Sequence, residues 1–255
     1  MDRALRLIVN PHAGGGRARR ALPAVQERLR ALGLRFSTEL TRDLDHARAL
    51  AADAAVAGEV AVPFSGDGLG GAVAGALRGR PGTVMGVPPG GRGNDFARVL
   101  GIPLEPVAAC DVLAHGATRR VDLGLAGGRP FIGIASLGFD SDANRIANRA
   151  PARLGNLVYL YGALRAVAGW RPATFTVVVD GATTTFTGWS VACANSKAYG
   201  GGMFLAPDAR LDDGLLDVVC TARTGKLRFL RLLPRVFKGT HVRLDEVRVL
   251  RGAEV

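Results

Sequence analysis

The chain has 255 residues, a formal net charge of +11 at neutral pH, and three widely spaced cysteines, Cys110, Cys193 and Cys220. This length suits one large domain or two modest ones. A composition of 48% hydrophobic and 22% charged residues is that of a globular protein, which excludes a disordered chain. The sequence contains neither an apolar run long enough to span a bilayer nor a secretory leader after Met1. We therefore expect a cytoplasmic protein with buried, reduced thiols.

Glycine and arginine are the unusual components. The 35 glycines cluster without a period, which excludes collagen and favours functional loops. Nearly all cations are arginines, concentrated near residues 17–30 and 223–238, and such a surface attracts nucleotides and anionic membranes. The later group is interspersed with leucines, which fits either a membrane-surface helix or, preferably, a core helix with a solvated basic face. No basic groove with interleaved aromatic residues is present, so nucleic acid is not an expected partner.

The first half of the chain alternates short apolar runs with helical patterns. Strands are predicted at residues 5–9, 36–40, 60–64 and 84–87. Helices are predicted near residues 18–32, from Asp43 or Asp45 to residue 56, and from the end of Ser65-Gly66-Asp67-Gly68 to about residue 77. Two more are predicted over residues 94–100 and 103–114. Repeated strand–loop–helix units favour a parallel sheet with helices on both faces.

The second half is richer in β-strand patterns. Strands are predicted at residues 120–125, 130–135, 174–179, 183–187, 190–194, 215–220 and 247–250, and helices near 140–148 and 154–169. Turn signals stand at Asp180-Gly181 and Asp213-Gly214. We therefore expect an α/β domain over residues 1–123 and a mainly antiparallel domain over residues 124–255.

Three glycine-rich loops each follow a predicted strand, at residues 10–17, 65–71 and 88–95. Ligands bind at the carboxyl ends of parallel strands, where glycines let backbone N–H groups approach phosphate oxygens. Arg17 and Arg92 could neutralise phosphate charge, while Asp67 and Asp95 suit Mg²⁺, a ribose hydroxyl or a reacting proton. A single glycine-rich loop of this kind, taken alone, would be interpreted as a tight turn. Three together favour a nucleotide site, although neither a Walker A nor a Rossmann pattern is present.

Several segments resemble the diacylglycerol kinase catalytic-domain family, which includes bacterial lipid kinases and sphingosine kinases. Ser65-Gly66-Asp67-Gly68 is similar to its Gly-Gly-Asp-Gly-Thr signature, and Gly93-Asn94-Asp95-Phe96-Ala97-Arg98 with Gly101-Ile102-Pro103 resembles the bacterial branch. The further matching segments are Arg120–Gly124, Gly200–Gly202, Ala206-Pro207 and Asp213–Asp217. The resemblance runs in order from residue 10 to about 219 and is specific when taken together.

The resemblance implies a fold and a set of site residues. The fold is an N-terminal nucleotide domain, akin to phosphofructokinase and NAD kinase, followed by a β-sandwich, with the site in the cleft between them. The residues implied to contact ATP are Asn10, Thr41, Ser65, Gly66, Asp67, Gly68, Leu69, Gly91, Arg92, Gly93 and Asn94. A structural Mg²⁺ would be held by the Asp213 carboxylate and the main-chain oxygens of Arg210 and Leu215. Without the family, Asp213-Gly214 would be a plain β-turn.

The implied reaction is transfer of the γ-phosphoryl group from Mg·ATP to the hydroxyl of diacylglycerol or a similar lipid, with Asp67, Asp95 and Asp122 near the metal and the acceptor. The expected partners are ATP, the lipid and an anionic membrane surface to which the protein associates peripherally, and a homodimer remains an open arrangement. The alternatives are a kinase for a sphingoid base or another hydroxyl acceptor, and a catalytically impaired nucleotide- or lipid-binding protein. NAD kinase is less favoured.

The chain departs from the family pattern at four places. Ser65 and Leu69 replace a glycine and a threonine of the signature, Gly71-Ala72 stands where Asn-Glu is usual, and Arg92 replaces a threonine. The fourth departure concerns an Asp-Gly-Glu segment whose Glu is the family's expected general base. The chain ends at Ala253-Glu254-Val255 without a match to it, so we expect the second domain to be incomplete at its C-terminus.

Overall fold

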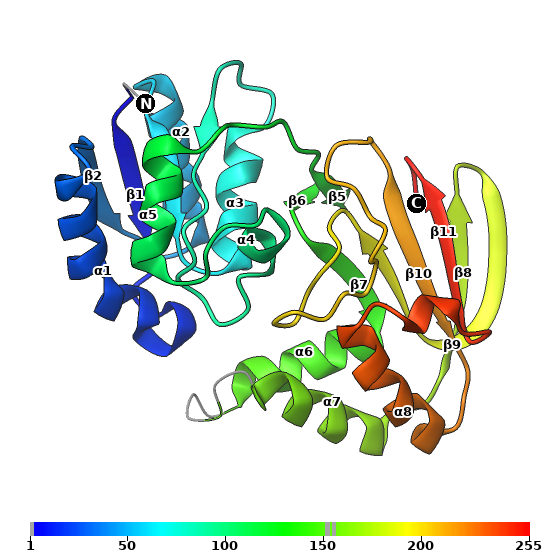
Figure 1. Cartoon of the computed structure of the whole chain (residues 1–255). Coiled ribbons are helices and arrows are strands. Elements are labelled where there is room, and N and C mark those ends of the chain that lie inside the picture. The colour runs from blue at the N-terminus through cyan, green and yellow to red at the C-terminus, as the bar shows by residue number, and fades with distance from the viewer. Residues whose placement is uncertain (1–2, 151–153, 155–156) are drawn as a thin grey trace. The chain divides into compact units, whose positions relative to one another are not determined.

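A computed structural model describes residues 3–150, 154 and 157–255 (Figure 1). The chain divides into two compact units, Met1–Ile132 and Gly133–Val255. The sequence places the boundary between residues 123 and 124. The structural division falls later because a hairpin over residues 124–131 packs on a helix of the first unit.

The first unit is built on a four-stranded parallel sheet with the strand order β2-β1-β3-β4. The strands are β1 (Leu5–Val9), β2 (Phe36–Leu40), β3 (Val60–Phe64) and β4 (Val84–Met85). The helices are α1 (Ala13–Ala31), α2 (Leu44–Val56), α3 (Asp67–Leu77), α4 (Asp95–Val99) and α5 (Pro106–His115). These bounds follow the predicted alternation closely. At α2, the Asp43 carboxylate caps the helix by accepting a 2.7 Å hydrogen bond from His46 N–H.

Alternate residues of β1 face opposite sides of the sheet, as the pleat requires. Leu7 is buried in a cluster with Val25 of α1 and Leu113 of α5. Ile8 is buried in a second cluster with Leu50 of α2 and Val73 of α3. Helices therefore cover both faces of the sheet, the arrangement expected for a buried parallel sheet. Figure 1 shows this layering in blue, cyan and green.

The hairpin of β5 (Gly124–Ala126) and β6 (Arg129–Phe131) belongs to the first unit. Its turn is Gly127-Gly128, with φ of 54° and 75°, positive values that favour glycine in a two-residue hairpin turn. Its β6 strand packs on α3, where a Cβ added to Gly75 would lie 2.2 Å from Pro130 Cγ. The small residues of α3 thus allow this close approach.

The second unit contains one five-stranded antiparallel sheet. Its strands are β7 (Ile134–Gly138), β8 (Ala173–Val179), β9 (Ala182–Ala194), β10 (Leu216–Ala222) and β11 (Val247–Gly252). The predicted turn Asp180-Gly181 joins β8 to β9 with φ of 47° and 85°. The sequence predicts two strands at 183–187 and 190–194, whereas the structure continues one strand through Gly188.

Strand β9 pairs along its length with three other strands of the sheet. Its first half pairs with β8, and its second half pairs with β7 and β10. The register shifts opposite Gly188, where an added Cβ would lie 2.3 Å from the Thr221 carbonyl oxygen. Val177 of β8 consequently packs in one buried cluster with Val191 of β9 and Val218 of β10. This sandwich-like closure is the antiparallel second domain that the sequence predicts.

The described residues of the second unit also form the helices α6 (Phe139–Arg149), α7 (Leu157–Gly169) and α8 (Lys226–Phe237), with a short 3₁₀ turn at His241–Arg243. The predicted helix over 154–169 begins among residues that fall partly outside the described part of the chain. The helices meet the sheet through an aromatic cluster in which the Trp189 and Phe229 rings stack with centroids 4.0 Å apart. Helix α8 buries Phe229, Leu232 and Val236, so it is a core helix with a basic outer face.

Candidate nucleotide site

The candidate site in the first unit lies where the parallel strands end. Asn10 follows β1, Thr41 follows β2 and Ser65 follows β3. The Thr41 N–H donates to the Val9 carbonyl at 2.8 Å, and the Thr41 hydroxyl donates to the same oxygen at 3.3 Å. The sheet therefore places these three predicted contact residues at one edge, as its topology requires.

The second and third glycine loops are in direct contact. The Gly90 N–H donates to the Ser65 carbonyl at 2.8 Å, which extends the parallel pairing beyond β3. A Cβ added to Gly91 would lie 2.5 Å from Gly66 Cα and 2.9 Å from Gly66 N. Real Cβ atoms do not approach so closely, so this crossing of two backbones depends on glycine.

The first loop joins the same assembly. Gly14, Gly15 and Gly16 adopt left-handed conformations with φ of 59°, 69° and 85°, so the regular part of α1 begins after them, near the predicted start. A Cβ on Gly14 would lie 3.1 Å from the Gly90 carbonyl oxygen. The Asn10 side chain shapes this loop, because its Oδ1 accepts a hydrogen bond from His12 N–H at 3.0 Å. The three predicted loops therefore converge.

Asn94 braces the third loop from within. Its backbone is left-handed, with φ of 52°, and its side chain is 4% exposed. The side-chain Oδ1 accepts from Gly91 N–H at 2.8 Å, and the amide Nδ2 donates to the Gly91 carbonyl at 3.0 Å. Both ends of the amide are thus directed at the main chain of the loop.

Asp67 connects the second loop to α4. Its carboxylate oxygens accept hydrogen bonds from the backbone N–H groups of Asp95 at 3.0 Å and Phe96 at 2.9 Å. A carboxylate at this place satisfies N–H donors that the first turn of a helix leaves unpaired. The Asp95 side chain is buried, with its Oδ1 3.9 Å from Nε of Arg98. Two of the three predicted acidic residues are therefore in contact, through the Asp67 carboxylate and the Asp95 backbone N–H.

The remaining predicted contacts are placed as follows. The Leu69 side chain is 4% exposed and packs in the core beside α2, so only its backbone faces the loop. Gly93 is buried, Gly68 is exposed, and Arg92 is half-buried. Asp122, the third predicted carboxylate, is half-buried. It lies in the segment that precedes β5, outside α3 and α4.

The predicted Mg²⁺ loop lies in the second unit. Gly214 has a φ of 71°, and the Asp213 Oδ1 accepts a hydrogen bond from Leu215 N–H at 3.2 Å, so the segment is a tight turn. Arg210 Nε lies 3.7 Å from the Asp212 carboxylate. One carboxylate with neighbouring carbonyl oxygens is a donor set that suits a hard cation. In the described part of the chain, no cluster of three or more His, Cys, Asp or Glu side chains could share a metal.

No sequence motif indicates a partly buried polar cluster in the second unit, in which Ser190 and the Oδ2 atom of Asp140 are buried. The Asp140 carboxyl at the start of α6 is enclosed with the side chains of Ser190 and Tyr199. Burial raises the pKa of Asp140 from 3.8 to about 6, against the opposing effect of hydrogen bonds from these two hydroxyls. Burial and the neighbouring Asp140 also raise the pKa of Tyr199 well above its usual range. A carboxyl of this pKa can exchange a proton near neutrality. Its partners are far apart in sequence, so no motif indicates them.

No helix in the described residues combines the length and apolar character needed to cross a membrane.

Comparison with known protein families gives a separate match for each of the two units. Residues 4–126 match the family described as the diacylglycerol kinase catalytic domain, and residues 133–255 match the YegS C-terminal NAD kinase beta sandwich-like domain.

Relatives share most of the chain. It is 36% identical over 258 residues to a diacylglycerol kinase of Mycobacterium tuberculosis (strain H37Rv), covering 97% of this chain and 82% of that protein. It is 31% identical to a diacylglycerol kinase of Bacillus subtilis (strain 168), covering 95% and 81%. A crystal structure of a diacylglycerol kinase from Bacillus anthracis str. Sterne has the same fold, with a TM-score of 0.72, 22% identity and coverage of 98% and 83%. The chain therefore belongs to the diacylglycerol kinase family of lipid kinases.

Proposed function

We propose that this chain uses Mg·ATP to phosphorylate the hydroxyl of diacylglycerol or a closely similar lipid while associated peripherally with an anionic membrane. The observation that carries the ATP assignment is the contact among three glycine loops at one sheet edge, with Gly91 crossing Gly66. Exposed backbone N–H groups in glycine loops bind phosphate oxygens. Membership of a lipid kinase family supports the acceptor class.

Different residues of the loops would have different roles in the reaction. Main-chain N–H groups of the Ser65–Leu69 and Arg92–Asn94 segments would hold the phosphates, while Asn94 holds the Gly91 N–H, and the half-buried Arg92 guanidinium would pair with phosphate oxygens. Asp67 holds α4 through two backbone N–H groups, which fixes Asp95 beside it. Such positioning supplies much of the catalysis of phosphoryl transfer.

Metal ions would contribute charge neutralisation on the transferred phosphoryl group when bound. We assign the acidic side chains Asp67, Asp95 and Asp122 to the catalytic metal and the acceptor. Asp213, with the carbonyl oxygens of Arg210 and Leu215, is assigned to a structural Mg²⁺.

The test is a phosphorylation assay with radiolabelled ATP and diacylglycerol in mixed micelles. Parallel reactions contain sphingosine or no lipid, and ATP binding is measured by calorimetry. Product with diacylglycerol alone supports the proposal. Product with sphingosine alone favours the sphingoid alternative. ATP binding without any product points to the impaired binding protein.

An Asp67→Asn variant tests the site within this assay. The amide keeps one acceptor for the α4 N–H groups but loses the charge, so we expect activity to fall by about 10²-fold or more while the fold persists. Asp45→Asn, which changes an exposed aspartate on α2, is the matched control. Equal activity of the two variants would remove Asp67 from the catalytic machinery.

A further inference from the structure

Helix α7 has an apolar outer face. Its inner face, which includes Ala163, Ala166 and Val167, packs against the aromatic cluster of the second unit. The outward side chains are Leu157, Leu160, Tyr161 and Leu164, which are 63%, 50%, 42% and 49% exposed. Their spacing of three and four residues places them on one side of a helix. A helix that is apolar on both sides is unusual at a protein surface and indicates a partner for its outer side.

The stretches of chain that contain α7 and α8 carry only basic charges, whereas α6, which packs on α7, carries Asp140 and Asp142. The sequence has no Asp or Glu between residues 143 and 179 or between residues 218 and 244, the stretches that contain α7 and α8. Among the described residues, the exposed cations in the first stretch are Arg145, which pairs with Asp142, and Arg149, Arg165 and Arg171. Exposed cations on or beside α8 are Arg223, Lys226, Arg228, Arg231, Arg235 and Lys238, of which Arg228 pairs with Glu246.

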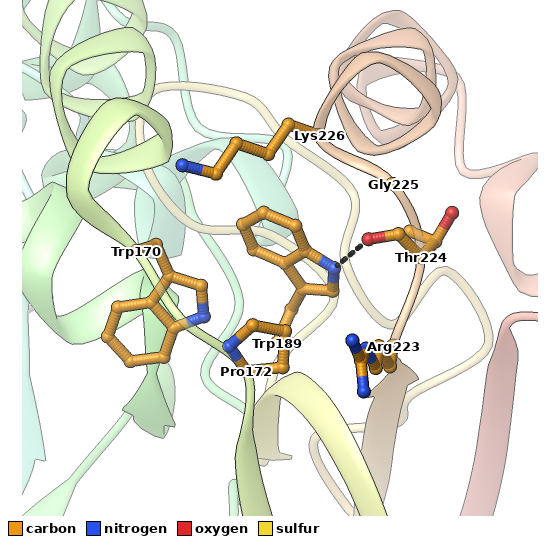
Figure 2. Close-up of a pocket in the computed structure, with 7 residues that line it drawn as sticks. All are labelled: Trp170, Pro172, Trp189, Arg223, Thr224, Gly225 and Lys226. Carbon is orange, nitrogen blue, oxygen red and sulfur yellow. Dashed lines mark hydrogen bonds between the residues drawn. The ribbon is translucent and has the colours of Figure 1, made fainter.

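The two helices meet where α7 ends and α8 begins. Lys226 Nζ donates a 2.7 Å hydrogen bond to the Ala168 carbonyl, which holds the first turn of α8 beside the last turn of α7. A hollow of about 490 Å³ lies at this junction, and its lining includes Trp170, Trp189, Arg223 and Lys226 (Figure 2). Leu227, the next residue along α8, is 76% exposed. Apolar, aromatic and basic side chains thus share the junction of the two helices.

We propose that this surface, the α7 docking face (Leu157, Leu160, Tyr161 and Leu164 with the neighbouring cations of α7 and α8), rests on an anionic lipid bilayer. The leucines enter the boundary between headgroups and acyl chains, while the long basic side chains reach anionic headgroups. The inference rests on the proposed function, since a lipid kinase must reach a substrate held in a membrane.

The charge pattern favours a bilayer over a second copy of the chain. A symmetric dimer through this face would bring like cations together, because each copy presents the same patch to the other. An anionic membrane supplies the opposite charge over the whole face.

The test is co-sedimentation of the whole chain with phosphatidylcholine vesicles prepared with or without phosphatidylserine. We expect binding that requires phosphatidylserine and weakens with added salt. The double variant Leu160→Glu/Leu164→Glu should bind these vesicles about tenfold more weakly or worse, because two apolar anchors become anions. The matched control is Val56→Glu, which changes an 82% exposed side chain at the far end of α2. Thermal unfolding by circular dichroism establishes that all three proteins are folded.

Three outcomes overturn the proposal: unchanged binding of the double variant, equal loss in Val56→Glu, or binding indifferent to phosphatidylserine. Light scattering adds a fourth, because a wild-type dimer that the double variant converts to a monomer would assign the face to self-association.

A water-soluble short-chain diacylglycerol separates this proposal from the proposed function. The double variant should phosphorylate that substrate as wild type does and lose activity only on vesicles. Another outcome is that wild type phosphorylates neither substrate while its vesicle binding still depends on Leu160 and Leu164. That result would refute the kinase function but support the docking face.

Discussion

Two side chains that we expect to contribute to the ligand site, those of Asn94 and Asp67, also support the loops themselves. Asn94 directs both ends of its amide at Gly91, and Asp67 caps α4 with both carboxylate oxygens. The physical reason is that tight loops and helix starts leave backbone donors without partners, and short polar side chains satisfy them. Such residues can shape a phosphate site without touching the phosphate through their side chains.

Asp140 provides a pH test at this scale. Its folded pKa of about 6 lies above its usual 3.8, so the folded state favours the neutral carboxyl. The stability from this neutral form is fully present below about pH 4 and is lost as pH rises through about 6. Asp140→Asn mimics the neutral form at every pH. As the pH rises from about 4 to above about 6, the free energy of unfolding of Asp140→Asn should therefore increase relative to that of wild type by an amount on the order of 3 kcal/mol.

Urea unfolding of wild type and Asp140→Asn, near pH 4 and above about pH 7, measures this difference. A difference between the two proteins that is the same at both pH values would contradict the buried, neutral state of Asp140.

At the scale of elements, the site depends on the ends of β1 and β3 and on the loop beyond β4. Each loop is locally a turn that leads into a helix, α1, α3 or α4. What makes them one feature is that Gly14 and Gly66 both lie against the Gly90-Gly91 backbone. The parallel order β2-β1-β3-β4 produces this contact, because it places successive strand ends side by side.

Gly91→Ala tests that contact. The new Cβ would lie 2.5 Å from Gly66 Cα, so one loop must move, and we expect ATP affinity measured by calorimetry to fall about tenfold or more. Gly169→Ala is the control, since a Cβ there meets nothing within 4 Å and its backbone needs no positive φ. Unchanged affinity in Gly91→Ala would remove this crossing from the nucleotide site.

At the scale of the whole molecule, two units with separate cores share one chain. The chain has two tryptophans, Trp170 and Trp189, and both lie in the second unit. Tryptophan fluorescence therefore reports the second unit, whereas far-ultraviolet circular dichroism reports both.

Mg·ATP should stabilise the first unit by mass action, by about 2.7 kcal/mol at a concentration of 100 times its Kd. At a constant Mg²⁺ concentration, we expect ATP to raise the melting transition seen by circular dichroism and to leave the tryptophan transition nearly in place. Equal shifts in both signals would mean that the units unfold as one cooperative body.

The sequence by itself determined the local features and the family. Apolar runs located the four parallel strands, Asp180-Gly181 located a hairpin turn, and glycine clusters located the three loops. The loop motifs also identified the lipid kinase family, which the comparisons confirm. These features are legible because each depends on residues within a few positions of one another.

Only the tertiary structure decided which distant residues meet and which faces remain open. Nothing local predicts that the Asp140 carboxyl meets the hydroxyls of Ser190 and Tyr199. The hairpin at residues 124–131 joins the first unit because Gly75 leaves room for Pro130. Helix α7 is the sharpest case. Both of its sides are apolar, so periodicity cannot distinguish the buried side from the exposed one, and only packing against the aromatic cluster leaves Leu160 and Leu164 facing outward.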